Sequence, residues 1–144
     1  MTIDDCRMIE FPRIVDPEGS LTFIEGERHV PFDIKRVFYI YDVPTAESRG
    51  AHAHKELEQV LICLSGSFDV LLDDGVRRRE VRMNRPWRGL HVPRMIWAAI
   101  INFDPGSVCL VLASARYDEA DYYRDYEEYL RAKRSGSAAA AGAR

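Results

Sequence analysis

The sequence of 144 residues has few cysteines and no long apolar run. Its three cysteines are an odd number, and two of them, Cys63 and Cys109, stand inside apolar stretches. This pattern indicates reduced, buried thiols in a cytoplasmic protein and not a disulfide framework. No apolar run approaches the ~18 residues of a membrane span, and the N-terminus lacks the charged-then-apolar layout of a signal peptide. We therefore expect a cytoplasmic protein that does not bind a membrane.

The chain also lacks a strong charge of either sign. Its formal net charge is −3, so the whole chain offers no electrostatic reason to bind nucleic acid. One local basic run, Arg77-Arg78-Arg79, follows a turn and is interpreted as the solvated face of a hairpin. The length predicts one domain that is large enough to bury a core.

Turn residues recur about every 8–12 residues and separate short strands, which is typical of a sandwich or a barrel. Residues 16–19 have proline and glycine at turn positions, and Asp74-Gly75 is a strong two-residue hairpin signal. Residues 36–41 are rich in β-branched and aromatic side chains. Residues 59–64 form a continuous apolar run, as in a strand that is buried on both faces. These patterns predict an all-β fold.

The pattern changes near the C-terminus. Residues 118–133 are acidic early and basic late, which matches the dipole of a helix. Four residues recur on one face of this helix and are expected to pack it on the sheet: Tyr122, Tyr126, Tyr129 and Leu130. Residues 135–144 are of low complexity and are expected to form a flexible tail. The predicted domain therefore covers residues 1–134.

A histidine pair is the first candidate for chemistry. His52 and His54 form an H-x-H motif, and Glu58 follows four residues later. On a strand both imidazoles point to the same face, whereas Ala51 and Ala53 point to the other and are small and apolar. Two converging imidazoles indicate either a metal site or acid–base chemistry.

The spacing H-x-H-x-x-x-E before a short hairpin resembles the first motif of the cupin superfamily. The fold of that superfamily is a small double-sheet β-barrel of the jelly-roll type, which we therefore expect here. Its second motif, P-x-G-x-x-H-x-x-x-N, fits residues 93–102 in spacing. Met95 and Ala98 stand at the positions of its glycine and its histidine.

The missing histidine bears on metal binding. Because the side chain of Ala98 carries no metal-binding atom, the usual centre of three histidines and one glutamate cannot be completed. We therefore expect no metal and no other cofactor. A triad of His52, His54 and Glu58 could still hold a metal ion, and a metal-dependent cupin stays open as an alternative.

Longer stretches resemble the sugar-nucleotide 3,4-ketoisomerases, which act on dTDP-4-keto-6-deoxyglucose. The matching residues are 35–42, 49–55, 57–61, 72–75, 93–97, 113–114, 117–122 and 124–126. Together they extend roughly from Asp16 to Leu130, which is nearly the whole chain. The resemblance implies a metal-free isomerase that works as a homodimer on a dTDP-linked ketosugar. A sugar-nucleotide-binding cupin without catalytic activity is the second alternative.

The resemblance also implies roles for the histidines. A neutral imidazole near its ordinary pKa of about 6.5 can remove a C3 proton that the adjacent C4 carbonyl acidifies, and an enediol or enediolate results. By similarity His52 is the base at C3. His54 is the second acid–base group or an electrophile that polarises the C4 oxygen. Tyr39 or Tyr41 supplies a phenolic donor or relays a proton; we name Tyr39 as the catalytic candidate and Tyr41 as a substrate ligand.

Four further residues are expected at the substrate. Arg49 suits a pyrophosphate, because a guanidinium can form bidentate contacts with phosphate, and Arg36 lies in a matching stretch. Ala98 stands where the resemblance implies a His or Arg side chain that reaches the sugar, and Glu18 stands where it implies a residue associated with the face on which C4 is reprotonated. Neither residue matches the pattern expected for a galacto- or a gluco-configured product.

Overall fold

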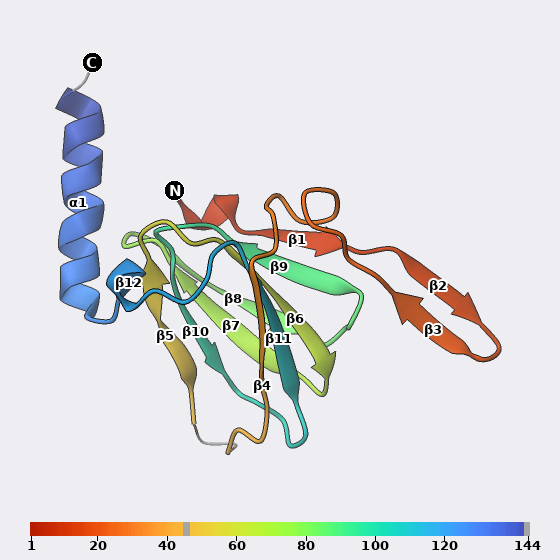
Figure 1. The fold of residues 1–144 in the computed structure, drawn as a ribbon. Coiled ribbons are helices and arrows are strands. Elements are labelled where there is room, and N and C mark those ends of the chain that lie inside the picture. Colours follow the sequence, from red (N-terminus) through yellow and green to blue (C-terminus); the bar gives the residue numbers. More distant parts are fainter. Residues whose placement is uncertain (45–46, 143–144) are drawn as a thin grey trace.

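Two five-stranded antiparallel sheets lie face to face and form a jelly-roll barrel (Figure 1). This computed structural model describes residues 1–44 and 47–142. The first sheet contains, in spatial order, β1 (Arg7–Glu10), β9 (Arg88–Val92), β6 (Gln59–Ser65), β11 (Val108–Ala113) and β4 (Arg36–Ile40). The second contains β12 (Tyr122–Tyr123), β5 (Arg49–His54), β10 (Trp97–Ile101), β7 (Phe68–Asp73) and β8 (Arg78–Met83). The predicted all-β barrel with a C-terminal helix is confirmed.

A separate two-stranded hairpin projects from the barrel (Figure 1). It consists of β2 (Arg13–Asp16) and β3 (Gly19–Thr22), and the predicted turn at residues 16–19 joins them. The Asp16 carboxylate accepts the Glu18 N–H at 2.9 Å. Gly19 has a φ of 136°, which glycine adopts without a steric penalty. Glu18 therefore lies at the tip of an arm.

Strand β6 is buried on both faces, as its continuous apolar run predicts. Leu61 and Cys63 point into the barrel, where they belong to the main core cluster. Val60 and Ile62 point outward and pack with Phe32 and other residues in a second cluster. Both faces of this strand therefore need apolar side chains, which explains why its sequence does not alternate.

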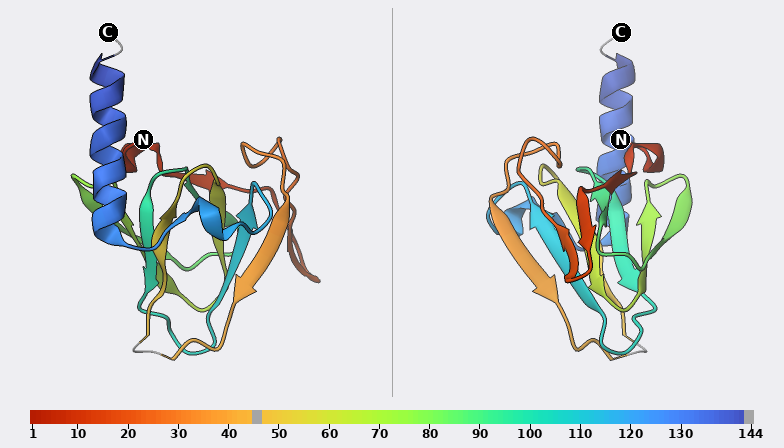
Figure 2. Two further views of the ribbon diagram at one scale, coloured as in Figure 1. Left: turned by 60° about the vertical axis from the view of Figure 1, so that its left-hand side comes forward. Right: turned by 90° about the vertical axis from the view of Figure 1, so that its right-hand side faces the viewer.

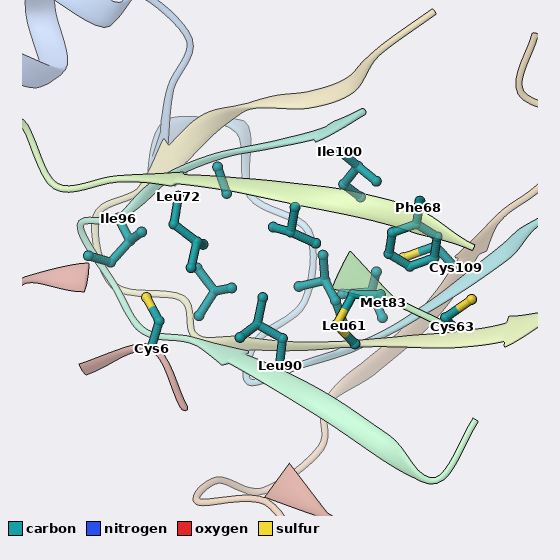
Figure 3. Packing of buried hydrophobic residues seen from close by; sticks show 14 of the residues in the cluster. Cys6, Leu61, Cys63, Phe68, Leu72, Met83, Leu90, Ile96, Ile100 and Cys109 are labelled. Atoms are coloured by element: carbon teal, nitrogen blue, oxygen red, sulfur yellow. The ribbon is translucent and has the colours of Figure 1, made fainter. Parts of the chain in front are cut away.

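The barrel interior holds the main core (Figure 3). Leu72, Leu90 and Ile100 pack there from three strands, and the figure shows Phe68 beside Cys109 at one end. All three cysteines are buried and unpaired, as predicted. Burial raises the pKa of Cys6 and of Cys109 to about 12, so these thiols stay protonated and unreactive at neutral pH.

The basic run lies on the exposed β7–β8 hairpin, as predicted. Arg77 pairs with Asp4 at 2.7 Å, and Arg78 pairs with Asp73 at 3.0 Å. Arg79 donates a hydrogen bond to the backbone carbonyl of Cys6 at 3.0 Å. All three guanidinium groups therefore contact groups of the same chain.

The C-terminal helix begins later than the predicted span of residues 118–133. Asp118 caps only a short 3₁₀ turn (Glu119–Asp121), and β12 follows that turn. The carboxylate of Asp125 then accepts backbone N–H groups at the start of α1 (Tyr126–Gly142). Both aspartates bond as helix caps do. The prediction placed the helix start at the first of them, whereas the pairing of β12 with β5 delays it to the second.

Helix α1 also continues beyond its predicted end and includes most of the predicted flexible tail. Residues 143 and 144 of that tail lie outside the described residues, and its mobility stays a prediction. The first turns of α1 lie beside the barrel and the rest projects away (Figure 2). The ring of Trp97 contacts Tyr126 and Tyr129 at centroid distances of 5.2 and 5.6 Å, so these two tyrosines pack the helix on the sheet as expected. Within the described residues, no helix is long and apolar enough to cross a membrane.

Candidate active site

Strand β5 brings the two histidines together between β10 and β12. His52 lies opposite Ala98 of β10, and His54 lies opposite Tyr122 of β12. The imidazoles share the face that points into the barrel, as the H-x-H spacing predicts. Their ring centroids are 4.8 Å apart, and the planes meet edge to face at 86°.

A register shift adds Arg49 to the same face of β5. His52 pairs with Ala98 and Arg49 pairs with Ile100, so three steps on β5 match two steps on β10. The extra residue is a β-bulge, which re-aims the side chains on one side of it. Without the bulge, the odd spacing between Arg49 and His52 would place them on opposite faces of the sheet. The bulge therefore lets both residues line one cavity.

That cavity has a volume of about 780 Å³, within the range of sites that hold a small ligand. Five of the predicted site residues are in its walls: Tyr39, Tyr41, Arg49, His52 and Ala98. Its apolar lining comes from Phe38, Ile40, Leu61, Ile100 and Val111. Gln59, Tyr122 and Arg124 add polar groups that were not predicted as site residues, although all three lie in stretches that resemble the ketoisomerases. The cavity thus places one imidazole, two guanidinium groups and the carboxylates of Asp42 and Glu47 around an apolar floor.

Burial keeps both imidazoles neutral at physiological pH. Desolvation lowers the pKa of His52 to about 4. A proton on His54 and the charge of Arg124 lower this pKa further, because both place positive charge near the ring. Desolvation likewise lowers the pKa of His54 to about 4, although the nearby Asp121 carboxylate opposes this shift. A neutral imidazole has a lone pair that can accept a proton.

The segment before α1 covers the histidines. The Tyr122 ring lies 4.9 Å from that of His52 and 4.3 Å from that of His54, measured between centroids. The Arg124 guanidinium lies over the same Tyr122 ring, 4.3 Å from its centroid. Arg124 is fixed in turn by Glu119, which accepts its Nε–H at 2.5 Å and an Nη2–H at 2.8 Å.

Sequence reasoning placed Tyr122 on a helix that packs on the sheet, and the structure corrects this. Tyr122 belongs to β12 and faces the imidazoles. It escaped prediction because the spacing of Tyr122, Tyr126 and Tyr129 fits a helix, although only the last two lie on one. The available signal was the resemblance of residues 117–122 to the ketoisomerases.

Asp121 joins this segment to the turn that follows β5. Its carboxylate accepts the N–H of Glu56 at 2.9 Å and that of Leu57 at 3.1 Å. Its backbone carbonyl accepts the Lys55 N–H at 2.8 Å. One carboxylate oxygen, Oδ2, also lies 3.5 Å from Nδ1 of His54. Asp121 therefore links the backbone around the histidines to an imidazole.

Three predicted site residues lie outside the lining of the cavity: Arg36, Glu18 and His54, whose ring lies beside that of His52. The guanidinium of Arg36 lies 4.9 Å from the centroid of the Phe38 ring and 5.6 Å from that of Tyr117. Its positive charge helps to lower the pKa of His54, so it belongs to the surroundings of the histidines. Glu18, on the hairpin arm, does not line the cavity of its own chain.

The metal triad of the alternative hypothesis is not assembled. Glu58 lies just before β6 and contacts His91, which is opposite the outward-facing Val60, whereas His52 of β5 is opposite Ala98 of the barrel core. Oε1 of Glu58 lies 2.9 Å from Nε2 of His91, and both residues line a second pocket of about 500 Å³. Among the residues that the structure describes, no group of three or more His, Cys, Asp or Glu side chains could hold a metal ion.

Tyr39 and Tyr41 lie on one face of the chain, because residues two apart on a strand point the same way. Their rings are 5.8 Å apart, and they are 62% and 59% exposed. Phe38 and Ile40 point instead into the barrel core. The two phenols therefore border the cavity and are not buried beside the imidazoles.

A jelly-roll barrel of this topology, with a ligand-sized cavity in it, defines a protein of the cupin fold. Residues 4–134 match the family described as FdtA: WxcM-like, C-terminal. The chain belongs to this family.

Several relatives are named as sugar 3,4-ketoisomerases. The TDP-4-oxo-6-deoxy-α-D-glucose-3,4-oxoisomerase of Aneurinibacillus thermoaerophilus is 47% identical over 123 residues, which are 85% of this chain and 88% of that protein. A crystal structure of a variant of the 3,4-ketoisomerase QdtA from Thermoanaerobacterium thermosaccharolyticum, in complex with TDP-4-keto-6-deoxyglucose, is 42% identical with a TM-score of 0.89 and covers 90% of this chain and 94% of that one. The TDP-quinovose 3,4-ketoisomerase WlaRB of Campylobacter jejuni is 47% identical with a TM-score of 0.86, covering 90% and 99%. The protein is an isomerase of this class.

Proposed function

We propose that the protein moves the keto group of a TDP-linked 4-keto-6-deoxyhexose from C4 to C3, with His52 and His54 as its acid–base groups. The observation that carries this proposal is the position of His52. It lies in the wall of the cavity, and burial holds its pKa near 4. The names of relatives that cover most of the chain supply the substrate class.

The reaction first requires removal of the proton on C3. The C4 carbonyl acidifies this C–H bond, and neutral His52 accepts the proton. The bonding electrons form a C3–C4 double bond, and the C4 oxygen takes up negative charge. The result is an enediolate, which becomes the product when C4 is protonated and C3 becomes the ketone.

A second proton must move between the oxygens. The C3 hydroxyl loses its proton as it becomes a carbonyl, whereas the C4 oxygen gains one as it becomes a hydroxyl. One acid–base group that handles the carbon-bound proton and a second that handles the oxygen-bound proton satisfy this requirement. His54, whose ring centroid lies 4.8 Å from that of His52, is the second group in our proposal.

The nucleotide end of the substrate needs positive charge for its two phosphates. Arg49 and Arg124 both line the cavity, and guanidinium groups bind phosphate oxygens in bidentate geometry. We assign Arg49 to the pyrophosphate. The exposed phenols of Tyr39 and Tyr41 at the cavity border favour contacts to the substrate over a proton relay to buried imidazoles.

Ala98 leaves room beside His52 where the wider superfamily carries a histidine. A water molecule in this space would be the donor to C4 in our proposal, and the hydroxide that it leaves would take back the proton that His52 removed from C3. The face from which this water reaches C4 would then set the configuration of the product.

We further propose that the chain works as a homodimer through the β2–β3 arm. Ile14, Val15 and Leu21 of the arm are each more than half exposed. Val37 on β4 is similarly exposed, and β4 is an edge strand of the first sheet. Exposed apolar side chains and an unpaired strand edge both favour association. An arm that docks on the partner would also carry Glu18 away from its own barrel, so a contact of Glu18 with substrate would occur in the partner's cavity.

Light scattering after size exclusion tests the dimer. Ile14→Glu places a charge on the arm and should give a monomer, because a buried unpaired charge is costly. Val76→Glu is the matched control, since Val76 is 91% exposed on a different hairpin. It should leave the mass unchanged. A monomeric wild-type protein would contradict the dimer without affecting the chemistry.

Proton NMR of the protein with TDP-4-keto-6-deoxyglucose in heavy water tests the isomerase. We expect deuterium at C3 and a new 3-keto species after treatment with a chelator, and the coupling constants of that species give the configuration at C4. His52→Asn should abolish the exchange. Binding of the nucleotide without exchange at C3 in the wild type would instead support a binding protein, and loss of activity on chelation would support a metal enzyme.

A further inference from the structure

One ring nitrogen of His54 is enclosed beside a carboxylate. The His54 side chain is 6% exposed, and Oδ2 of Asp121 lies 3.5 Å from its Nδ1. In the part of the chain that the structure describes, this fully buried nitrogen has no hydrogen-bond partner, and the Asp121 contact is too long to count as one. Buried polar groups are nearly always paired, because an unpaired one loses its hydration without compensation.

We propose that Asp121 is a positioning residue that holds neutral His54 as the Nδ1–H tautomer and so leaves Nε2 as the nitrogen that accepts a proton. An ionised carboxylate can only accept a hydrogen bond. A proton on Nδ1 would therefore be attracted to Oδ2, whereas a lone pair there would be repelled. The distance of 3.5 Å is longer than an ordinary hydrogen bond, and such catalytic contacts often shorten when substrate binds.

The carboxylate of Asp121 is held where this interaction requires it. It accepts two backbone N–H groups, from Glu56 at 2.9 Å and from Leu57 at 3.1 Å. The Asp121 carbonyl accepts a third, from Lys55 at 2.8 Å. The group cannot rotate away from His54 without breaking bonds to the turn that follows β5, so its orientation is fixed before substrate arrives.

The other groups around His54 do not compete for this role. His52 and Tyr122 contact the ring by their own rings. Arg36 and Arg124 contribute positive charge and can only donate hydrogen bonds. Their charges oppose protonation of His54, whereas Asp121 favours it. Among these five neighbours, Asp121 is therefore the one that stabilises a proton on Nδ1.

The consequence for the reaction depends on the proposed function. With its proton on Nδ1, His54 begins as an acceptor at Nε2 and cannot donate from that atom to polarise the C4 oxygen. It would first take the proton from the C3 hydroxyl, whose oxygen keeps the bonding electrons. The imidazolium so formed would then give the Nε2 proton to the C4 oxygen. Asp121 stabilises this transient charge, as a buried aspartate does beside a catalytic histidine.

Nitrogen-15 NMR of the free protein, with ¹⁵N-labelled histidine, reads the tautomer without substrate. The chain has four histidines, and His54→Gln identifies the signals of His54 by their loss. At pH 7.5 we expect a protonated-type shift for Nδ1 and an unprotonated-type shift for Nε2. The Nε2–H tautomer in the wild type would overturn the proposal. So would an unchanged tautomer in Asp121→Ala, where we expect a mixture.

Two further variants separate positioning from a merely structural effect. Ser114→Ala is the matched control, because Ser114 Oγ accepts the Glu58 N–H at 2.8 Å from the same turn without contacting His54. It should leave the tautomer unchanged. In the wild type, Oδ2 of Asp121 accepts the buried Leu57 N–H and is also the oxygen near His54. In Asp121→Asn the one remaining oxygen of the side chain should keep this position. The Nδ1–H tautomer should therefore be retained in this variant although the negative charge is lost.

Steady-state kinetics add a second readout. Asp121→Ala should lower kcat about 10- to 100-fold, the usual effect of removing a group that orients a catalytic residue. KM should change little, because Asp121 does not line the cavity. A loss confined to KM would overturn the positioning role. If the wild-type protein exchanged no proton at C3, the proposed function would fail, yet the tautomer of His54 would still be read from the free protein.

Discussion

His52 and Ala98 lie directly opposite each other on the antiparallel neighbours β5 and β10. Side chains at such positions have Cβ atoms about 4.5–5.5 Å apart and share one face of the sheet. The methyl group of Ala98 therefore occupies the site from which a longer side chain would reach the substrate beside His52. Both residues line the same cavity.

Ala98→His is expected to change the product ratio or the rate. The new imidazole would fill the space that we assign to water and would place a donor next to C4. We expect a change in turnover of about tenfold or more, as positioned acid–base groups contribute 100- to 10,000-fold. NMR of the product mixture and initial rates measure both quantities. If neither changes, this position does not steer the reaction.

The activity should persist at low pH because both imidazoles have a lowered pKa. Burial holds the pKa of His52 and of His54 near 4, so the neutral, active forms survive as the pH falls below the ordinary histidine pKa of about 6.5. We expect kcat/KM to fall only as the pH approaches 4. A profile of kcat/KM from pH 4 to 8, with activity regained at pH 7.5, measures this. An acid limb centred at pH 6.5 would contradict the assignment of buried imidazoles.

Tyr122→Ala should move that acid limb to higher pH. The Tyr122 ring covers both imidazoles, and desolvation is the largest cause of their lowered pKa values. Removing the ring admits water, which favours the charged form and raises both pKa values, by roughly one unit. Tyr122→Phe keeps the ring and is the control that should leave the limb in place. Equal profiles for the two variants would mean that another group shields the site.

Much of the barrel can be predicted from local residue patterns in the sequence. The turn at residues 16–19 and the two-faced strand at residues 59–64 depend on local residue types, so local reasoning finds them. The H-x-H pair likewise shares one face because strand geometry requires it. Asp121 and Tyr122 could not be found in this way. Their role depends on the pairing of β12 with β5, which joins segments far apart in the sequence.

Three residues show why spacing alone misleads. The orientation of Arg49 depends on a β-bulge in β5. The extra residue does not change the alternation of apolar and polar residues in β10, so the sequence gives no sign of it. Glu58 keeps the spacing of a cupin ligand, yet it lies in the link between β5 and β6 and contacts His91 instead. Met95 stands where the superfamily has glycine and has a φ of 60°. The sequence shows the substitution there, but only the structure shows that the backbone kept the left-handed conformation.

Gly66→Ala is expected to destabilise the fold by roughly 3 kcal/mol. Gly66 has a φ of 75°, which costs a residue with a side chain roughly 1–2 kcal/mol. An added Cβ would also lie 2.8 Å from Cα of Ser107 and would collide with its Oγ, an overpacking that costs roughly 1–3 kcal/mol. Gly106→Ala is the matched control, because Gly106 has a φ of 78° and open space around it. Urea unfolding should give about 1 kcal/mol for the control, and equal losses would contradict the collision.

Glu58→Gln is expected to leave catalysis unchanged, and this separates the acid–base enzyme from a metal enzyme. Glu58 pairs with His91 on the outward face of the first sheet. An amide keeps the hydrogen bond to His91 while losing the charge, so the free energy of unfolding should fall by about 1 kcal/mol or less. A carboxylate that bound a metal with His52 and His54 would instead be essential, because an amide is a far weaker ligand for a transition metal. We expect kcat and KM within twofold of the wild type, measured after treatment with a chelator and again with added Fe²⁺, Mn²⁺ or Zn²⁺. A loss of activity in Glu58→Gln that an added metal restores would instead support a metal enzyme that uses His52, His54 and Glu58.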